Sequence, residues 1–156
     1  MDFFRMFINP VLLVPTCSWL LAQVLKTIIN AVMNKKMEWS RLVGDGGMPS
    51  GHSATVSALA TMVGFAVGFD SVEFAIAAVL AVVVMHDASG VRLETSKQAA
   101  TIISMVEVIN DYLSESDTNI KTDKLKVLVG HTPLQVLFGA LLGIAVAVGY
   151  KLLIAG

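Results

Sequence analysis

The sequence predicts an all-α fold: a small polytopic membrane helical bundle with about four membrane spans plus an amphipathic cytoplasmic helix. Hydrophobic residues make up 55% of the 156 residues, charged residues make up 15%, and the mean hydropathy is +0.73. Soluble domains of this size are more polar. Long stretches without a charged side chain alternate with polar segments, which is typical of membrane spans and the loops that join them.

Four apolar stretches are candidate membrane spans, and the first has the length of about 20 helical residues that crosses the hydrocarbon core of a bilayer. They cover residues 6–25 (with apolar character continuing to 33), 52–69, 74–85, and the segment that begins just after His131 and runs to the C-terminus. The second stretch is rich in small residues, which let membrane helices approach closely, so we expect it inside the bundle. Two prolines in the first stretch and the lack of a small-x-small cleavage site favour a retained span over a signal peptide.

A polar region, residues 88–130, lies between the third and fourth stretches. Within it, apolar residues recur at helical spacing over 97–113, which predicts the amphipathic helix. The segment SESDTNIKTDK at 114–124 that follows is loop-like in composition. The sequence contains no internal repeat, and we expect residues 1–156 to form a single domain.

Basic residues set the expected orientation in the membrane. They gather between the first and second stretches and between the third and fourth, whereas the turn between the second and third holds only Asp70 and Glu73. The positive-inside rule therefore places both basic loops in the cytoplasm and both termini on the other side, with Arg5 and Lys151 as minor exceptions. The net charge of −1 argues against a nucleic-acid partner.

The segment GDGGMPSGHSA, residues 44–54, directly precedes the second stretch. Glycines permit close backbone approach, and Ser50 or Ser53 can cap a helix that starts near His52. The free amides and the dipole at such a helix N-terminus favour phosphate, and a histidine on the first turn can protonate a phosphate ester oxygen. A capped membrane turn with an incidental histidine explains the segment equally well. His86 and His131 lie at the same membrane level, which favours a shared site, although we expect a structural role for His86.

Three segments together resemble the superfamily of type 2 phosphatidic acid phosphatases and vanadium haloperoxidases. PSGH at 49–52, DASGVR at 87–92 and GHTPLQV at 130–136 are similar to its small divergent bacterial and plastid branch, labelled acid phosphatase/vanadium-dependent haloperoxidase-related. The resemblance covers nearly the whole chain. It implies a helical bundle in the bacterial inner (plasma) membrane that hydrolyses phosphomonoesters or pyrophosphates through a phosphohistidine, without a metal or cofactor.

The resemblance also implies roles for individual residues of the motifs. His131 corresponds to the nucleophile that attacks phosphorus, and His52 corresponds to the general acid that protonates the leaving oxygen. The Ser50 hydroxyl and the Gly51 amide correspond to groups that hold phosphate oxygens.

The cation of the first motif has two candidates, Lys26 and the basic group at 36–41, and we favour Lys26 with Arg41 assisting. A lysine within an apolar helix is a functional hypothesis by default. Snorkelling of the Lys26 side chain to the cytoplasmic interface is the alternative.

The third motif of the family normally has an arginine six residues before its histidine and a carboxylate four residues after it, but this chain has Leu125 and Gln135 there. A carboxylate would accept a hydrogen bond from the other ring N–H of a nucleophilic histidine and stabilise the imidazolium, whereas Gln135 offers only a neutral amide. One interpretation is that Asp87 supplies the carboxylate and Arg92 the bidentate phosphate contact. The other is a weakened or inactive phosphatase that retains an anion-binding pocket. The DASG run also fits a plain helix end with Gly90 left-handed.

We therefore expect a metal-independent membrane phosphatase that acts on a lipid or isoprenoid phosphate or pyrophosphate, with its site facing the cytoplasm. The alternative is a protein that binds anionic lipid phosphate, or acts as an interaction subunit, without turnover; a transporter would leave the three motifs unexplained. Zinc is disfavoured because no two histidines have His-x-x-x-His spacing. A homodimer stays open, since Gly139, Gly143 and Gly149 offer a small-residue helix contact.

Overall fold

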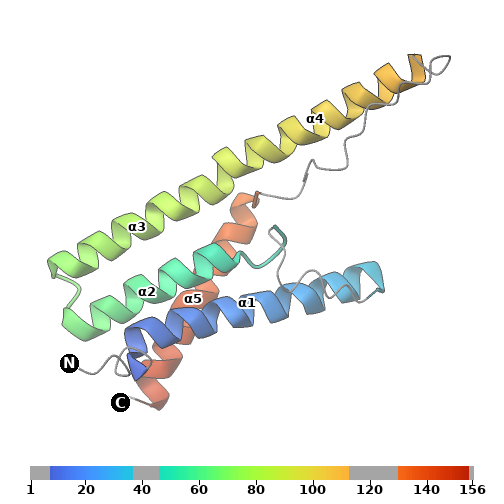
Figure 1. Ribbon diagram of the computed structural model, residues 1–156. Coiled ribbons are helices and arrows are strands. Elements are labelled where there is room, and N and C mark those ends of the chain that lie inside the picture. Colours follow the sequence, from blue (N-terminus) through green and yellow to red (C-terminus); the bar gives the residue numbers. More distant parts are fainter. Residues whose placement is uncertain (1–7, 37–45, 113–129, 155–156) are drawn as a thin grey trace.

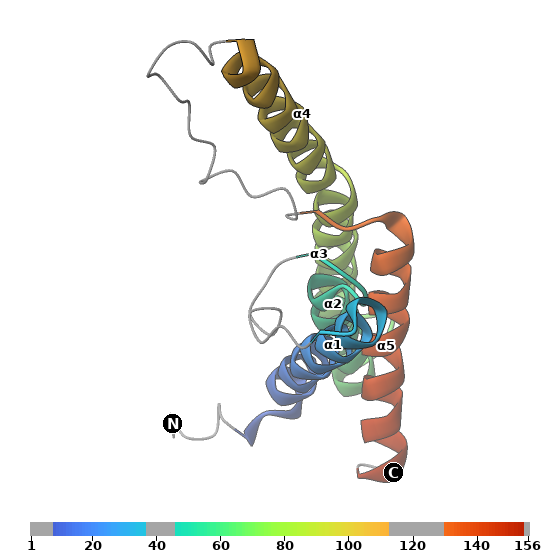
Figure 2. The same cartoon turned by 90° about the vertical axis from the view of Figure 1, so that its right-hand side faces the viewer.

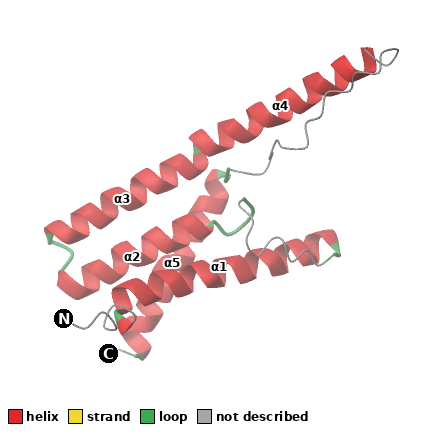
Figure 3. Cartoon of the chain, viewed as in Figure 1, coloured by secondary structure: helices red, strands yellow, loops and turns green. Residues whose placement is uncertain are grey.

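The computed structural model describes residues 8–36, 46–112 and 130–154, and the regular elements in these ranges are helices (Figure 3). In chain order they are α1 (Pro10–Asn34), α2 (Gly51–Val67), α3 (Val72–Ser89), α4 (Val91–Tyr112) and α5 (Pro133–Leu153). The predicted all-α fold is confirmed. The loop predicted at 114–124 lies outside the described residues.

Three helical segments are long and apolar enough to cross a membrane: α1, the 41 residues Val72–Tyr112 that join α3 to α4, and α5. The apolar helix α2 has 17 residues, so it rises about 26 Å, slightly less than the roughly 30 Å of a typical hydrocarbon core. The expected count of about four spans therefore holds when α2 is included as a short, interior helix.

Helix α2 is the centre of the bundle. It lies between α1 and α3 and contacts both, while α5 crosses α1 and α2 (Figure 1). The view turned by 90° shows the same order (Figure 2). Small side chains permit this packing, and Ala54 and Ala58 of α2 are fully buried. The prediction that the second stretch packs inside the bundle is confirmed.

Two glycines of α5 lie directly on α2. A Cβ atom at Gly139 would collide with the Ser50 carbonyl oxygen, and a Cβ atom at Gly143 would collide with the Ala54 carbonyl oxygen and the Ser57 hydroxyl. That hydroxyl donates a hydrogen bond to the carbonyl of Ala140 at 3.0 Å. The small-residue spacing considered for a homodimer is therefore used, at these two positions, within the chain.

The bundle has two distinct ends. The start of α1, the turn between α2 and α3, and the end of α5 lie at one end, as the expected topology requires (Figure 1). The first turn of α2, the junction of α3 and α4, and the start of α5 lie toward the other end. This arrangement brings the three motif segments, which are far apart in sequence, to one level of the bundle.

Helix α4 continues the direction of α3 and projects beyond the other helices (Figure 1). It begins six residues before the predicted start at residue 97, because only Gly90 separates it from α3. Among the described helices α4 contacts only α3, which it follows end to end, and its apolar side chains Ile102, Met105 and Val108 are exposed. The predicted amphipathic helix is therefore present, longer than expected.

The contact between α2 and α5 predicts a position-dependent effect of enlarging glycine. Gly143→Leu should destabilise the protein by about 1–3 kcal/mol or more, because overpacking displaces neighbouring backbone. Gly149→Leu is the matched control, since no atom lies within 4 Å of a Cβ placed at Gly149. Thermal unfolding in detergent micelles should show a clear loss for the first variant and little change for the second; equal stability of both would contradict the packing.

Candidate functional site

The loop that precedes α2 depends on two glycines with left-handed backbone. Gly46 and Gly47 have φ angles of 78° and 82°, a region that side-chain-bearing residues rarely adopt. After this turn, the Ser50 N–H donates to the carbonyl of Gln135 at 3.0 Å. The loop is thereby tied to the first turn of α5.

Ser50 is the N-cap of α2, and its hydroxyl oxygen accepts from the Ser53 N–H at 3.3 Å. Of the two serines considered as caps, the structure selects Ser50. Gly51 follows in a tight space, because a Cβ atom there would lie 3.1 Å from Cδ1 of the Trp19 indole. The first amides of α2 have no acceptor within the helix, which makes this end suited to an anion.

Lys26 is buried in α1 and packs against the same loop. It is 5% exposed, and a Cβ atom at Gly47 would lie 3.2 Å from its Cγ. The side chain therefore runs along the loop backbone inside the protein, which does not fit the snorkelling alternative. Burial of a lysine is costly unless its charge is compensated, and this position places the charge beside the candidate site.

His131 is the largest fully buried side chain of the described residues, at 1% exposed. Its backbone N–H donates to the carbonyl of Ala88 at 2.9 Å. Its ring Nδ1 lies 3.1 Å from the Gly47 carbonyl oxygen and 3.3 Å from Oε1 of Gln135. The loop before α2, the end of α3 and the start of α5 therefore all hold this one residue.

The partners of Nδ1 define which ring nitrogen carries the proton. A backbone carbonyl can only accept, and Oε1 of Gln135 already accepts from the Thr132 N–H at 3.1 Å in the capping box of α5. Nδ1 of His131 must therefore be the donor. In the neutral ring, Nε2 is then left with a free lone pair, as a nucleophile requires.

The surroundings also keep the His131 ring neutral. Burial, above all, lowers the pKa of His131 below its ordinary value of 6.5, and the positive charges of Lys26 and His52 lower this pKa further. Hydrogen bonds to Gln135 and Gly47 oppose the shift. At neutral pH the ring is therefore uncharged.

His52 lies on the first turn of α2, beside His131. The ring centroids are 5.9 Å apart and the ring planes are inclined at 68°, a direct edge-to-face contact. No phosphate fits between the two ring faces at this separation. A phosphate that contacts both histidines has to lie alongside the pair.

Asp87 and Arg92 lie beside His52. Together with His52, Val83, Val84 and Ala88, these residues line a cavity of about 370 Å³. Nε of Arg92 donates to Oδ2 of Asp87 at 2.7 Å, and the two side chains are 41% and 44% exposed. Asp87 is therefore paired with Arg92. The oxygens that orient the His131 ring, a role considered for Asp87, come from Gly47 and Gln135.

The junction between α3 and α4 positions the start of the third motif. Gly90 has φ −103° and ψ −91°, so the alternative of a helix end with a left-handed Gly90 is wrong. A Cβ atom at Gly130 would collide with the backbone of Leu93, and the Gly130 N–H donates to Oγ of Ser96 at 3.1 Å. These contacts fix the backbone immediately before His131.

The contacts that Gly47, Gly130 and Ser96 make with the third motif were not predicted from the sequence. The paired glycines at 46–47 were a visible signal of left-handed backbone, whereas nothing in the sequence indicated the Gly130 to Ser96 contact. Arg41 and Leu125 lie outside the described residues. Lys26, Ser50, Gly51, His52 and His131 are brought together around the loop, with Asp87 and Arg92 on the side of His52.

The lowered pKa of His131 predicts a pH-dependent stability. The unfolded ring binds a proton below about its ordinary pKa, while the folded ring does so only at lower pH, so unfolding is favoured as pH falls through that window. The stabilisation should be complete above about pH 6.5 and lost as the pH drops. The unfolding temperature in detergent should therefore fall more steeply on acidification for wild type than for His131→Gln; parallel curves would contradict the shift.

Comparison with known proteins agrees with the three motifs. Residues 7–146 match the family described as the Divergent PAP2 family, a range that includes every candidate site residue. The chain is 43% identical over 129 residues to the uncharacterized membrane protein YuiD of Bacillus subtilis (strain 168), a match that covers 79% of this chain and 82% of that protein. No solved structure matches the chain. The chain is thus a membrane protein that belongs to the Divergent PAP2 family.

Proposed function

We propose that this protein is a membrane phosphatase that hydrolyses a lipid or isoprenoid phosphate or pyrophosphate through a phosphohistidine, with its site facing the cytoplasm. The observation that carries the proposal is the state of His131. Its ring is buried, donates from Nδ1 to Gly47 and Gln135 so that Nε2 keeps its lone pair, and lies against the ring of His52.

In the first step, Nε2 of His131 attacks phosphorus, a P–N bond forms, and the bond from phosphorus to the leaving oxygen breaks. Protonated His52 transfers its proton to that leaving oxygen. In the second step, water attacks the phosphohistidine, the P–N bond breaks, and His52 takes a proton from the water. Inorganic phosphate leaves, and both histidines return to their starting states.

Charge on the phosphate is met by Lys26, by the amides at the start of α2 and by the Ser50 hydroxyl, which can donate while its oxygen caps the helix. Lys26 contributes twice. Its charge attracts the phosphate, and the same charge lowers the pKa of His131 and so disfavours protonation of the nucleophile. Arg92 has further guanidinium N–H groups besides the Nε that contacts Asp87, and these can bind a phosphate oxygen.

Gln135 is the observation that favours the second candidate, a membrane protein that binds anionic lipid phosphate without turnover. The imidazolium that forms with the P–N bond would face two neutral oxygens instead of a carboxylate, which stabilises it less. Vanadate binding without phosphate release from any lipid phosphate would support this candidate. A sharp gain in turnover on Gln135→Glu would show that the natural site is weakened.

Alanine variants of the two histidines test the mechanism. His131→Ala should abolish phosphate release because no nucleophile remains, and His52→Ala should lower it by about 10²–10⁴-fold because general acid catalysis is lost. The measurement is phosphate released from lipid and prenyl phosphates by purified protein in detergent. His86→Ala, at an exposed position of α3, should retain activity; full activity in His131→Ala would refute the mechanism.

Orientation in the bacterial inner membrane is tested by tags at the two termini. The positive-inside rule predicts that both tags face away from the cytoplasm, which leaves the end of the bundle with His52 and His131 on the cytoplasmic side. A membrane-impermeant reagent applied to intact spheroplasts should reach both tags. Protection of both tags until the membrane is opened would reverse the proposed orientation.

A further inference from the structure

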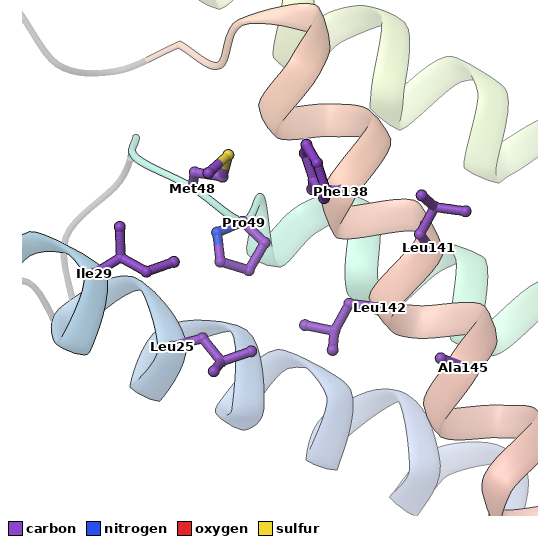
Figure 4. A pocket seen from close by; sticks show the side chains of 8 residues that line it. All are labelled: Leu25, Ile29, Met48, Pro49, Phe138, Leu141, Leu142 and Ala145. Carbon is purple, nitrogen blue, oxygen red and sulfur yellow. The ribbon is translucent and has the colours of Figure 1, made fainter.

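We propose that the groove between α1 and α5 receives the single hydrocarbon chain of the substrate, so that the site is built for single-chain phosphates. The inference rests on the proposed function. The groove is lined by Leu25 and Ile29 of α1, by the Met48–Pro49 turn, and by the α5 segment 138–145, with a volume of about 370 Å³ (Figure 4). Every side chain that lines it is apolar, and we call it the α1–α5 groove.

Residues that line the α1–α5 groove directly adjoin candidate site residues along the chain. Met48 directly follows Gly47, whose carbonyl accepts from His131, and Pro49 directly precedes the capping residue Ser50. On α1, Leu25 directly precedes Lys26 in sequence. A phosphate held at Ser50, Lys26 and His131 would therefore have the mouth of an apolar groove beside it.

The volume of the groove matches that of one hydrocarbon chain. A methylene group is similar in size to a water molecule, which takes about 30 Å³, so the groove holds about a dozen such groups. Phe138 and Ala145 are seven residues apart, which corresponds to a length of about 10 Å along a helix. One prenyl or alkyl chain fills this space, and a diacyl lipid would leave its second chain outside.

The groove is open toward lipid, because Phe138 and Leu141 are 46% and 53% exposed. A chain can thus enter sideways from the bilayer. Since the chain is already in hydrocarbon before it enters, the groove adds little hydrophobic affinity. Its effect is to align the chain and so place the attached phosphate against His131.

Two further cavities lined by described residues are unsuited to a hydrocarbon chain. One contains the ion pair of Asp87 and Arg92 beside His52. The other, of about 280 Å³, is lined in part by Ser96, Lys97 and Gln135. Burial of polar and charged groups against an alkyl chain is unfavourable, so the α1–α5 groove is the apolar one of the three.

Photo-crosslinking tests the groove without requiring turnover. Farnesyl phosphate and dodecyl phosphate, each with a diazirine on its chain, are bound to the protein in detergent, irradiated, and the labelled residues are mapped by mass spectrometry. Label should fall on 25–29 and 138–145, and unlabelled single-chain phosphate should displace it better than diacyl phosphatidate. Stronger labelling by one probe identifies a prenyl or an alkyl chain; label mainly on α3, or better competition by phosphatidate, would overturn the proposal.

A variant that fills the groove provides the second test. Ala145→Phe should reduce hydrolysis and labelling for farnesyl phosphate by about tenfold and leave hydrolysis of the short dimethylallyl phosphate unchanged. Ala75→Phe, at an exposed position of α3, is the matched control and should change neither. An unchanged chain-length profile in Ala145→Phe would contradict the groove.

The same labelling is carried out with wild type and with His131→Ala, which separates the two proposals. Label in the groove without phosphate release from wild type would reject the phosphatase and retain the groove. Phosphate release that requires His131, with label outside the groove, would reject the groove and retain the phosphatase.

Discussion

The hydrogen bond from the His131 ring to the carbonyl of Gly47 is the contact on which the candidate site depends. It joins two segments that are 84 residues apart, and it requires the left-handed backbone of the loop before α2. Because the carbonyl can only accept, the contact also decides which ring nitrogen is protonated. One backbone group thus fixes the place of the histidine and its chemical state together.

Close packing of α2 on α5 makes this contact reachable. Gly139 lies against Ser50, so the second turn of α5 and the first turn of α2 approach to backbone distance. The hydrogen bond from the Ser50 N–H to the Gln135 carbonyl joins the same two helix ends. A membrane bundle gains little from the hydrophobic effect between helices, so close van der Waals packing and such hydrogen bonds carry the local structure. The small residues of α2 and α5 are in this sense part of the candidate site.

The sequence predicted the helical class and the level at which the motifs meet, because uncharged stretches and their flanking charges are local properties. It also selected Lys26, His52 and His131, which the structure brings to one loop. It could not predict that Gly47 and Gln135 hold the His131 ring, or that Asp87 pairs with Arg92. Those contacts depend on helix orientation and on the loop path, which local composition does not determine. Gln135 illustrates this difference. In the sequence it stands where the family has a carboxylate, while in the structure its amide oxygen accepts hydrogen bonds from both the Thr132 N–H and the His131 ring.

The long rod formed by α3 and α4 has a mechanical consequence for the nucleophile. The His131 N–H donates a hydrogen bond to the Ala88 carbonyl at the end of α3. The Gly130 N–H donates to the Ser96 hydroxyl near the start of α4. Most of α4 extends past the bundle (Figure 1). Of the two helices in the rod, α3 therefore packs among the other helices and α4 projects beyond them. A change in the direction of α4 at Gly90 would shift Gly130, the residue directly before His131. The backbone that leads into the nucleophile therefore depends in part on α4, which among the described helices contacts only α3.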